Sequence, residues 1–328
     1  MEQYRPRVFL SSLLAFGLIL PVLAQRGPGG DAVRDLPAPI RLMLDRAGKQ
    51  RYTGQRVVEF RAEGNRIRNT EVVTVDGRFS RTEFLTGSDA AGQIIIDGPR
   101  GRQHFYPDRN EIIVGPSPKD EGVARLRMLL KKRREGALRM TFSAGGNIAG
   151  RATLLMAVAD RAGNSIQRLW VDEATGLPLK RELYDRVGTK TGSFEFTRIN
   201  FAPRIDPKDF EINRRGAKIV PIRDILLGKA KELGFTVYSL PDTTGAALQN
   251  IRIVDLAGGK GLVQSFSRDG RVLTLFQLKS AVNMERLQRA SGGRGKAHRW
   301  NVGGYTLVLV GDLPPAELQA LAKQVRSL

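Results

Sequence analysis

The chain of 328 residues contains no cysteine and only two histidines, His104 and His298. Without cysteine there is no disulfide, no thiol nucleophile and no metal site built on thiolates, so packing alone must hold each domain together. The two histidines lie far apart in the sequence, and neither has a partner at metal-ligand spacing. We therefore expect no metal, no other cofactor, and a structural or surface role for both histidines.

Motifs of the common enzyme classes are also missing. There is no G-x-S-x-G sequence, and two histidines offer few chances for a Ser-His-Asp triad. Gly295-Lys296 fails as the end of a phosphate-binding loop, because Ala290 replaces its first glycine and Ala297 its Ser or Thr. The paired carboxylates Asp120-Glu121 and Asp172-Glu173 are better explained as turn and surface residues than as a glycosidase site. We expect no catalytic residues and a non-enzymatic protein, with a hydrolase as the weaker alternative.

Long apolar runs are scarce, and the one that stands out is N-terminal. Arg5 and Arg7 are followed by the apolar segment 8–20 and by Val22-Leu23-Ala24, with small residues at the −3 and −1 positions. This pattern is typical of a secretory signal peptide over residues 1–24, cleaved near Ala24. The run is shorter than the roughly 18 residues that span a bilayer, although an uncleaved anchor is the alternative. We therefore expect an exported, periplasmic protein.

Negative charge is under-represented, since 53 Lys and Arg face 33 Asp and Glu, a formal net charge of +20. Such an excess favours anionic partners. For an exported protein these are lipid head groups, lipopolysaccharide phosphates or an acidic protein segment, and not nucleic acid. The alternative is a generally basic composition without a specific partner, because the charge is spread along the whole chain.

The first domain is predicted over residues 38–203, after a flexible lead-in at 25–37. Ile40, Met43, Leu44 and Ala47 follow helical spacing, and a second helix has its apolar stripe at 123–130. Elsewhere the apolar period is two, which is typical of strands. Strands are predicted at 58–62, 71–75, 79–85, 93–97, 103–106, 111–114, 138–142, 150–159, 165–172, 177–185 and 191–201. In the last strand Phe194 and Phe196 are out of phase with later apolar residues, which indicates a bulge or a change of surface.

So many antiparallel strands with so few helices predict a large curved sheet or an open barrel. The two helices are the available covers for its inner face. If they cover it incompletely, an apolar pocket remains that suits acyl chains; the alternative is a fully packed core. The residues predicted to line this cavity are Val58, Phe60, Leu126, Leu130, Trp170, Phe194 and Phe196.

A linker is predicted over 204–221 and a second, α+β domain over 222–328. Its elements are a helix ending near Gly234, strands at 235–240, 251–255, 261–267, 271–278 and 305–310, and a last helix after Pro314-Pro315. Residues 284–299 are glycine-rich and basic, and we expect them to form a mobile surface loop. Its cations are the predicted partner-binding residues Arg286, Arg289, Arg294, Lys296 and Arg299.

Several short motifs occur in an order and spacing that cover nearly all of the chain after residue 40. They are Leu44-Asp-Arg-Ala47, Tyr52-Thr-Gly-Gln55, Ala149-Gly-Arg151, Leu169-Trp-Val-Asp172, Thr175-Gly-Leu-Pro-Leu179, Leu233-Gly-Phe235, the segment 267–276 and the segment 304–314. Together they resemble the periplasmic regulators of the envelope-stress sigma factor, the MucB/RseB type. The glycine-rich 291–295 stretch and the basic excess depart from that pattern.

The resemblance implies a first domain like the lipoprotein carrier LolA, an unclosed antiparallel β-barrel covered by helices, and a smaller α+β C-terminal domain. It also implies that the protein binds the periplasmic part of a membrane-bound anti-sigma factor, and that lipid-like signals release it. The alternative is a LolA-like carrier or chaperone of lipids or lipoproteins. The oligomeric state stays open.

Overall fold

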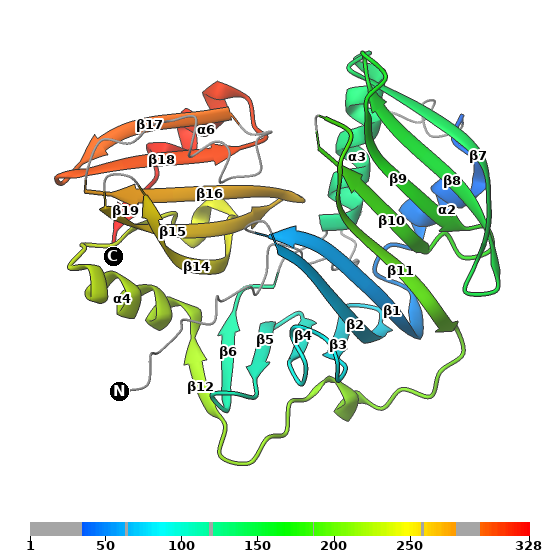
Figure 1. The fold of residues 1–328 in the computed structure, drawn as a ribbon, viewed down its shortest axis with the longest axis horizontal. Helices are drawn as coiled ribbons and strands as arrows, with labels where there is room; N and C mark the ends of the chain where they lie inside the picture. Colours follow the sequence, from blue (N-terminus) through cyan, green and yellow to red (C-terminus); the bar gives the residue numbers. More distant parts are fainter. Residues whose placement is uncertain (1–34, 63–64, 118–120, 186, 257–258, 280–295) are drawn as a thin grey trace. The chain divides into compact units, whose positions relative to one another are not determined.

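The structure is a computed structural model that describes residues 35–328, except 63–64, 118–120, 186, 257–258 and 280–295 (Figure 1). The predicted signal peptide, nearly all of the predicted lead-in, and Arg286, Arg289 and Arg294 lie outside the described residues. The described chain forms two compact units. The N-terminal unit comprises 35–112 and 121–217, and the C-terminal unit comprises 113–117 and 218–328. No described helix is both long and apolar enough to cross a membrane.

A twelve-stranded antiparallel sheet contains the strands of the N-terminal unit, as the period-two pattern predicts, and also β12 and most of β6, whose residues are assigned to the C-terminal unit. The strand order is β12-β6-β5-β4-β3-β2-β1-β11-β10-β9-β8-β7, so β1 pairs with β11 and the sheet ends unclosed at β7 and β12. The protein is therefore mainly β with an open sheet. The strands are β1 (Arg51–Ala62), β2 (Asn65–Asp76), β3 (Phe79–Phe84), β4 (Ile94–Gly98), β5 (Gly101–Tyr106), β6 (Glu111–Gly115), β7 (Leu138–Ile148), β8 (Arg151–Asp160), β9 (Ser165–Asp172), β10 (Pro178–Tyr184), β11 (Lys190–Asn200) and β12 (Lys218–Pro221).

Two helices pack on one face of this sheet, and we call that face the inner face. They are α2 (Ala38–Asp45) and α3 (Glu121–Arg134), both at predicted positions. Their buried residues share one core cluster with side chains of β8 and β9, and Figure 1 shows both helices beside these strands. The cluster consists of Leu36, Ile40, Met43, Leu126, Leu129, Met156, Val158, Leu169 and Val171.

The phase change predicted in β11 is a β-bulge. Gln55 of β1 pairs with Arg198, but the next residue, Arg56, pairs with Phe196, so one residue of β11 is left without an opposite partner. The extra residue reverses the alternation. Phe196 and Phe201 therefore both reach the ring of Tyr52, with centroids 6.0 and 6.2 Å away.

The segment predicted as a linker carries structure of its own. Its 3-10 turn η1 (Pro207–Phe210) begins with a capping box, in which Asp206 and Asp209 satisfy each other's backbone amides. The Phe210 ring packs against Phe79, with centroids 5.4 Å apart. Arg81 donates hydrogen bonds to the carbonyl oxygens of Asp209 and Glu211, at 3.1 and 2.9 Å. Residues up to 217 thus belong to the N-terminal unit.

The C-terminal unit is an antiparallel sheet of order β14-β15-β16-β18-β17. Helix α4 (Ile222–Leu233) ends at Gly234, whose φ of 61° is the left-handed conformation that glycine tolerates. Helix α6 (Pro315–Ala322) packs on the core formed by β16 and β18. The strands are β14 (Ala247–Leu256), β15 (Gly259–Arg268), β16 (Arg271–Leu278), β17 (Lys296–Val302) and β18 (Tyr305–Gly311), and a separate pair joins β13 (Tyr238–Ser239) to β19 (Arg326–Ser327).

Two sequence-based predictions are wrong in this unit. The strand expected at 235–240 shrinks to two residues, because buried glutamine side chains bind its backbone: Gln277 contacts Thr236 and Tyr238, and Gln264 contacts Tyr238. The end of the predicted mobile loop, 296–299, forms part of β17. Pairing with β18, together with the packing of Trp300 and Val302 on the core, outweighs its basic composition.

Candidate functional site

The inner face between β1 and β9 carries the predicted cavity residues and a row of polar groups. Val58, Phe194, Arg181 and Leu169 lie directly opposite one another across four adjacent strands. Because Leu169 belongs to the cluster under the helices, all four side chains are on the inner face. Arg181 donates two hydrogen bonds to Gln167 Oε1, at 3.1 and 2.7 Å. The face is therefore apolar but interrupted by a guanidinium and an amide.

The strongest polar feature of this face is an ion pair that the sequence analysis missed. Arg56 lies opposite Glu71, and both its Nε and Nη2 atoms are 2.8 Å from Glu71 Oε2. Both residues are only 5% exposed. The Arg56 guanidinium also lies 5.6 Å from the ring centre of Phe194 and 6.0 Å from that of Phe196. A charge held this far from water requires its partner, so the two residues act as one unit.

The predicted cavity-lining residues have different surroundings. Val58, Leu126, Phe194 and Phe196 are buried in the core, and Leu130 packs against the cluster under the helices. Trp170 is on the opposite face, because side chains alternate along β9 and its neighbours Leu169 and Val171 point inward. There its ring faces Lys180 Nζ at 4.9 Å. The prediction that Trp170 lines the cavity is therefore wrong, because its side chain lies on the other face of β9.

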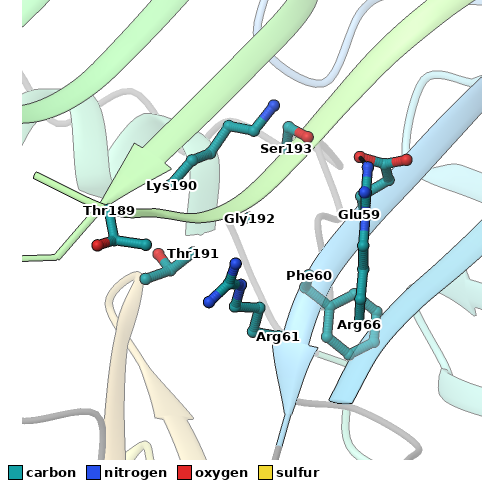
Figure 2. Close-up of a pocket in the computed structure, with 9 residues that line it drawn as sticks. All are labelled: Glu59, Phe60, Arg61, Arg66, Thr189, Lys190, Thr191, Gly192 and Ser193. Atoms are coloured by element: carbon teal, nitrogen blue, oxygen red, sulfur yellow. Dashed lines mark hydrogen bonds and ion pairs between the residues drawn. The ribbon is translucent and has the colours of Figure 1, made fainter. Parts of the chain in front are cut away.

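Phe60 is the predicted residue that lines a described pocket, at the rim of the sheet (Figure 2). The pocket has a volume of about 210 Å³ and lies between the end of β1, the start of β2 and the start of β11. Three cations surround it, and Figure 2 shows the guanidinium of Arg61 directed toward Thr191. Arg66 is paired with Glu59 at 2.7 Å. Its lining residues are Glu59, Phe60, Arg61, Arg66, Thr189, Lys190, Thr191, Gly192 and Ser193.

This combination suits an amphiphile with an anionic group. An aromatic ring offers apolar contact, while guanidinium, ammonium and hydroxyl groups can donate hydrogen bonds to phosphate or carboxylate oxygens. Sequence reasoning found Phe60 by its period-two phase. It missed the cations, because they come together only when the β1–β2 and β10–β11 hairpins lie side by side through the pairing of Phe60 with Gly192.

Of the predicted partner-binding cations, the structure places two. Lys296 and Arg299 are exposed on β17 and three residues apart, so they project to opposite faces of the sheet. Arg286, Arg289 and Arg294 fall outside the described residues, and their role stays a prediction.

His104 is buried and hydrogen-bonded at both ring nitrogens. Nε2 is 2.8 Å from Gln93 Oε1, and Nδ1 is 2.9 Å from the Tyr106 hydroxyl. Burial, together with repulsion from Arg102 and Arg109, lowers the pKa of His104 to about 3. The ring is therefore neutral at physiological pH. No group of three or more His, Asp and Glu side chains in the described part of the chain is placed to hold a metal ion.

The protein is therefore of the mainly β class, with an open antiparallel sheet that carries two helices on its inner face and with a smaller α+β C-terminal unit. The family model described as the MucB/RseB N-terminal domain matches residues 39–213, more than half of the chain. The chain belongs to this family.

Several solved structures are similar to this chain. "Crystal structure of MucB" is 16% identical with a TM-score of 0.47, covering 92% of this chain and 99% of that chain. The Pseudomonas aeruginosa MucA/MucB complex is 16% identical with a TM-score of 0.46, covering 90% of this chain and 99% of that chain. A LolA superfamily protein from Nitrosomonas europaea is 12% identical with a TM-score of 0.27, covering 53% and 97%. A comparison with curated proteins finds no match.

Proposed function

We propose that this protein is an exported, non-enzymatic regulator that binds the periplasmic segment of a membrane-bound anti-sigma factor and thereby controls envelope-stress transcription. The observation that carries the proposal is the family match over residues 39–213. Regulators of this family act on such a partner in the periplasm. The N-terminal sequence supports export, because residues 1–24 have the pattern of a secretory signal peptide.

The charge of the C-terminal region supports an acidic partner. Residues 218–328 contain 16 basic and 8 acidic side chains. An excess of this size speeds association with an acidic segment and makes the affinity fall as salt is added. Lys296 and Arg299 are the described members of the predicted contact set.

We further propose that the N-terminal unit senses a lipid-like amphiphile. The inner face supplies apolar surface, and the rim pocket beside Phe60 supplies cations. Ligand binding releases the partner only if the amphiphile has a higher affinity for the partner-free state than for the complex.

The test is a binding titration with the mature chain. Its partner is the exported segment of a membrane-bound anti-sigma factor from the same organism. A complex that weakens with added salt is expected, and purified lipopolysaccharide should displace the segment. Absence of a complex, both with and without lipopolysaccharide, would overturn the proposed regulation.

The rim pocket has a matched pair of variants. Arg61→Glu reverses a charge in the pocket, whereas Arg100→Glu makes the same change at an exposed turn between β4 and β5. Loss of lipopolysaccharide response in R61E alone supports the pocket, and equal responses contradict it. Transfer of bound lipid to an acceptor vesicle without partner release favours the carrier alternative.

A further inference from the structure

Sheet edges are the places where a folded chain can accept another strand, and the two large sheets of the described residues have four. Three are ill-suited to accept one. The edge strand β12 has four residues and ends in Pro221. The edge strands β7 and β14 each contain a bulge, between Ala144 and Gly146 and between Leu248 and Asn250. Short length, proline and bulges are the usual protections of an edge.

The fourth edge, β17, has none of these protections. Its seven residues pair with β18 without a register shift, from Lys296 opposite Gly311 to Val302 opposite Tyr305. The strand contains no proline and no glycine. In the described part of the chain no strand lies beyond it.

The turn that joins β17 to β18 shows which amides of β17 point away from the sheet. Gly303 and Gly304 form a two-residue turn with φ of 55° and 79°, the signature of a type I′ hairpin. In such a hairpin the flanking pair, Val302 and Tyr305, is hydrogen-bonded, and bonded pairs then alternate along the ladder. The outward backbone groups of β17 therefore belong to Ala297, Arg299 and Asn301.

We propose that β17 is a strand-addition site for an acidic, extended segment of the partner. This inference rests on the proposed function, because it describes how the anti-sigma segment docks. Backbone hydrogen bonds to Ala297, Arg299 and Asn301 supply affinity, and the exposed cations Lys296 and Arg299 select negative charge. The strand itself carries two cations and no carboxylate.

The same charges disfavour a second copy of this chain as the occupant. In an antiparallel pair of two β17 strands centred on its middle residue, Arg299 lies opposite Arg299 of the other copy. Like charges directly opposite one another destabilise strand pairing, whereas a carboxylate in that position stabilises it. The edge is thus protected against self-association by charge while it accepts an acidic strand.

The test uses the mature full-length chain and the exported anti-sigma segment. Ala297→Pro removes an outward amide without removing a ladder bond, and Ala297→Val is its control, because it keeps the amide and adds a side chain of similar bulk. We expect A297P to weaken the complex about tenfold and A297V to change it little. Arg299→Glu should weaken the complex by a similar factor and reduce its salt dependence.

Amide hydrogen exchange on the unmodified protein keeps the proposal testable if A297P does not fold. In the complex, exchange should slow at Ala297, Arg299 and Asn301 and stay unchanged at His298 and Trp300, which already bond to β18. Wild-type affinity in both A297P and R299E, or no slowing at the outward amides, overturns strand addition and leaves the proposed function standing. A dimer that A297P dissolves overturns the choice of occupant. If the wild-type chain forms no complex, the proposed function itself fails.

Discussion

Replacing Glu71 by Gln is expected to destabilise the N-terminal unit strongly. Glu71 is 5% exposed, and one of its carboxylate oxygens accepts hydrogen bonds from both Nε and Nη2 of Arg56 at 2.8 Å. The substitution keeps the size of the side chain and removes its charge. Arg56 then remains buried among the rings of Phe194 and Phe196 with no negative partner opposite it on β2.

The expected magnitude follows from the burial of both partners. Removing one member of a buried ion pair costs about 3–5 kcal/mol, whereas an exposed pair contributes at most about 1 kcal/mol. The measurement is urea unfolding in a Trp300→Phe background. Because the chain has two tryptophans, Trp170 is then the sole tryptophan and reports on the N-terminal unit.

Two further variants separate charge burial from side-chain packing. In Arg56→Met combined with Glu71→Leu, apolar groups replace the pair, and most of the lost stability should return because neither charge is left alone. In the exposed pair of Arg66 and Glu59, Arg66→Gln should cost less than about 1 kcal/mol. A loss under 1 kcal/mol for E71Q, or a double variant less stable than E71Q, would refute the reasoning.

Three other outcomes are expected from buried or constrained groups. The pKa of His104 is about 3 in the folded protein and about 6.5 in the unfolded chain. The free energy of unfolding should therefore fall by up to about 1.4 kcal/mol per pH unit as the pH drops from 6.5 toward 3. Urea midpoints measured against pH should show a flatter slope in His104→Gln. Burial acts to raise the pKa of Asp172, but hydrogen bonds from Arg151 and Thr175 outweigh it and lower the pKa. The stabilisation from Asp172 is therefore present above the unfolded pKa of an aspartate, about 3.9, and is lost as the pH falls below that value. Asp172→Asn should lower the urea midpoint more at pH 7 than at pH 3. A Cβ at Gly176 would clash with the backbone of α2 at Met43, so Gly176→Ala should lower the free energy of unfolding by more than about 2 kcal/mol in the same assay. Gly150 also has a positive φ but open space around it, so Gly150→Ala should cost only about 1 kcal/mol.

Much of the N-terminal unit could be predicted from the sequence, because apolar residues recur at a period of about 3.6 in its helices and of two in its strands. The two helices begin and end within a few residues of their predicted positions, and the phase change in β11 is the bulge that it indicated. Strand identity is local information, since it depends on alternation over a few residues. The same alternation shows why Trp170 was assigned to the wrong face of β9: its neighbours Leu169 and Val171 point inward, so Trp170 points outward.

The candidate sites depend on pairings between distant residues, which periodicity does not encode. Arg56 occupies an inward position of β1 where an apolar residue is expected, and only the register with β2 places Glu71 opposite it. The cations around Phe60 meet through the pairing of β1 with β11. Composition predicted a mobile loop at 284–299, whereas cross-strand pairing with β18 makes its last four residues, 296–299, part of a strand.

The two proposed sites lie in different units, the amphiphile pocket in the N-terminal unit and the strand-accepting edge in the C-terminal unit. A signal that releases the partner from such an arrangement must act through linked binding equilibria. By thermodynamic linkage, an amphiphile that weakens segment binding by a given factor is itself bound more weakly by the same factor in the presence of the segment. Direct competition for one surface would instead prevent any ternary complex. Two titrations separate these cases: segment affinity measured with and without amphiphile, and amphiphile affinity measured with and without segment. If both affinities fall by the same finite factor, the two ligands occupy separate sites; if no ternary complex forms, they share one surface.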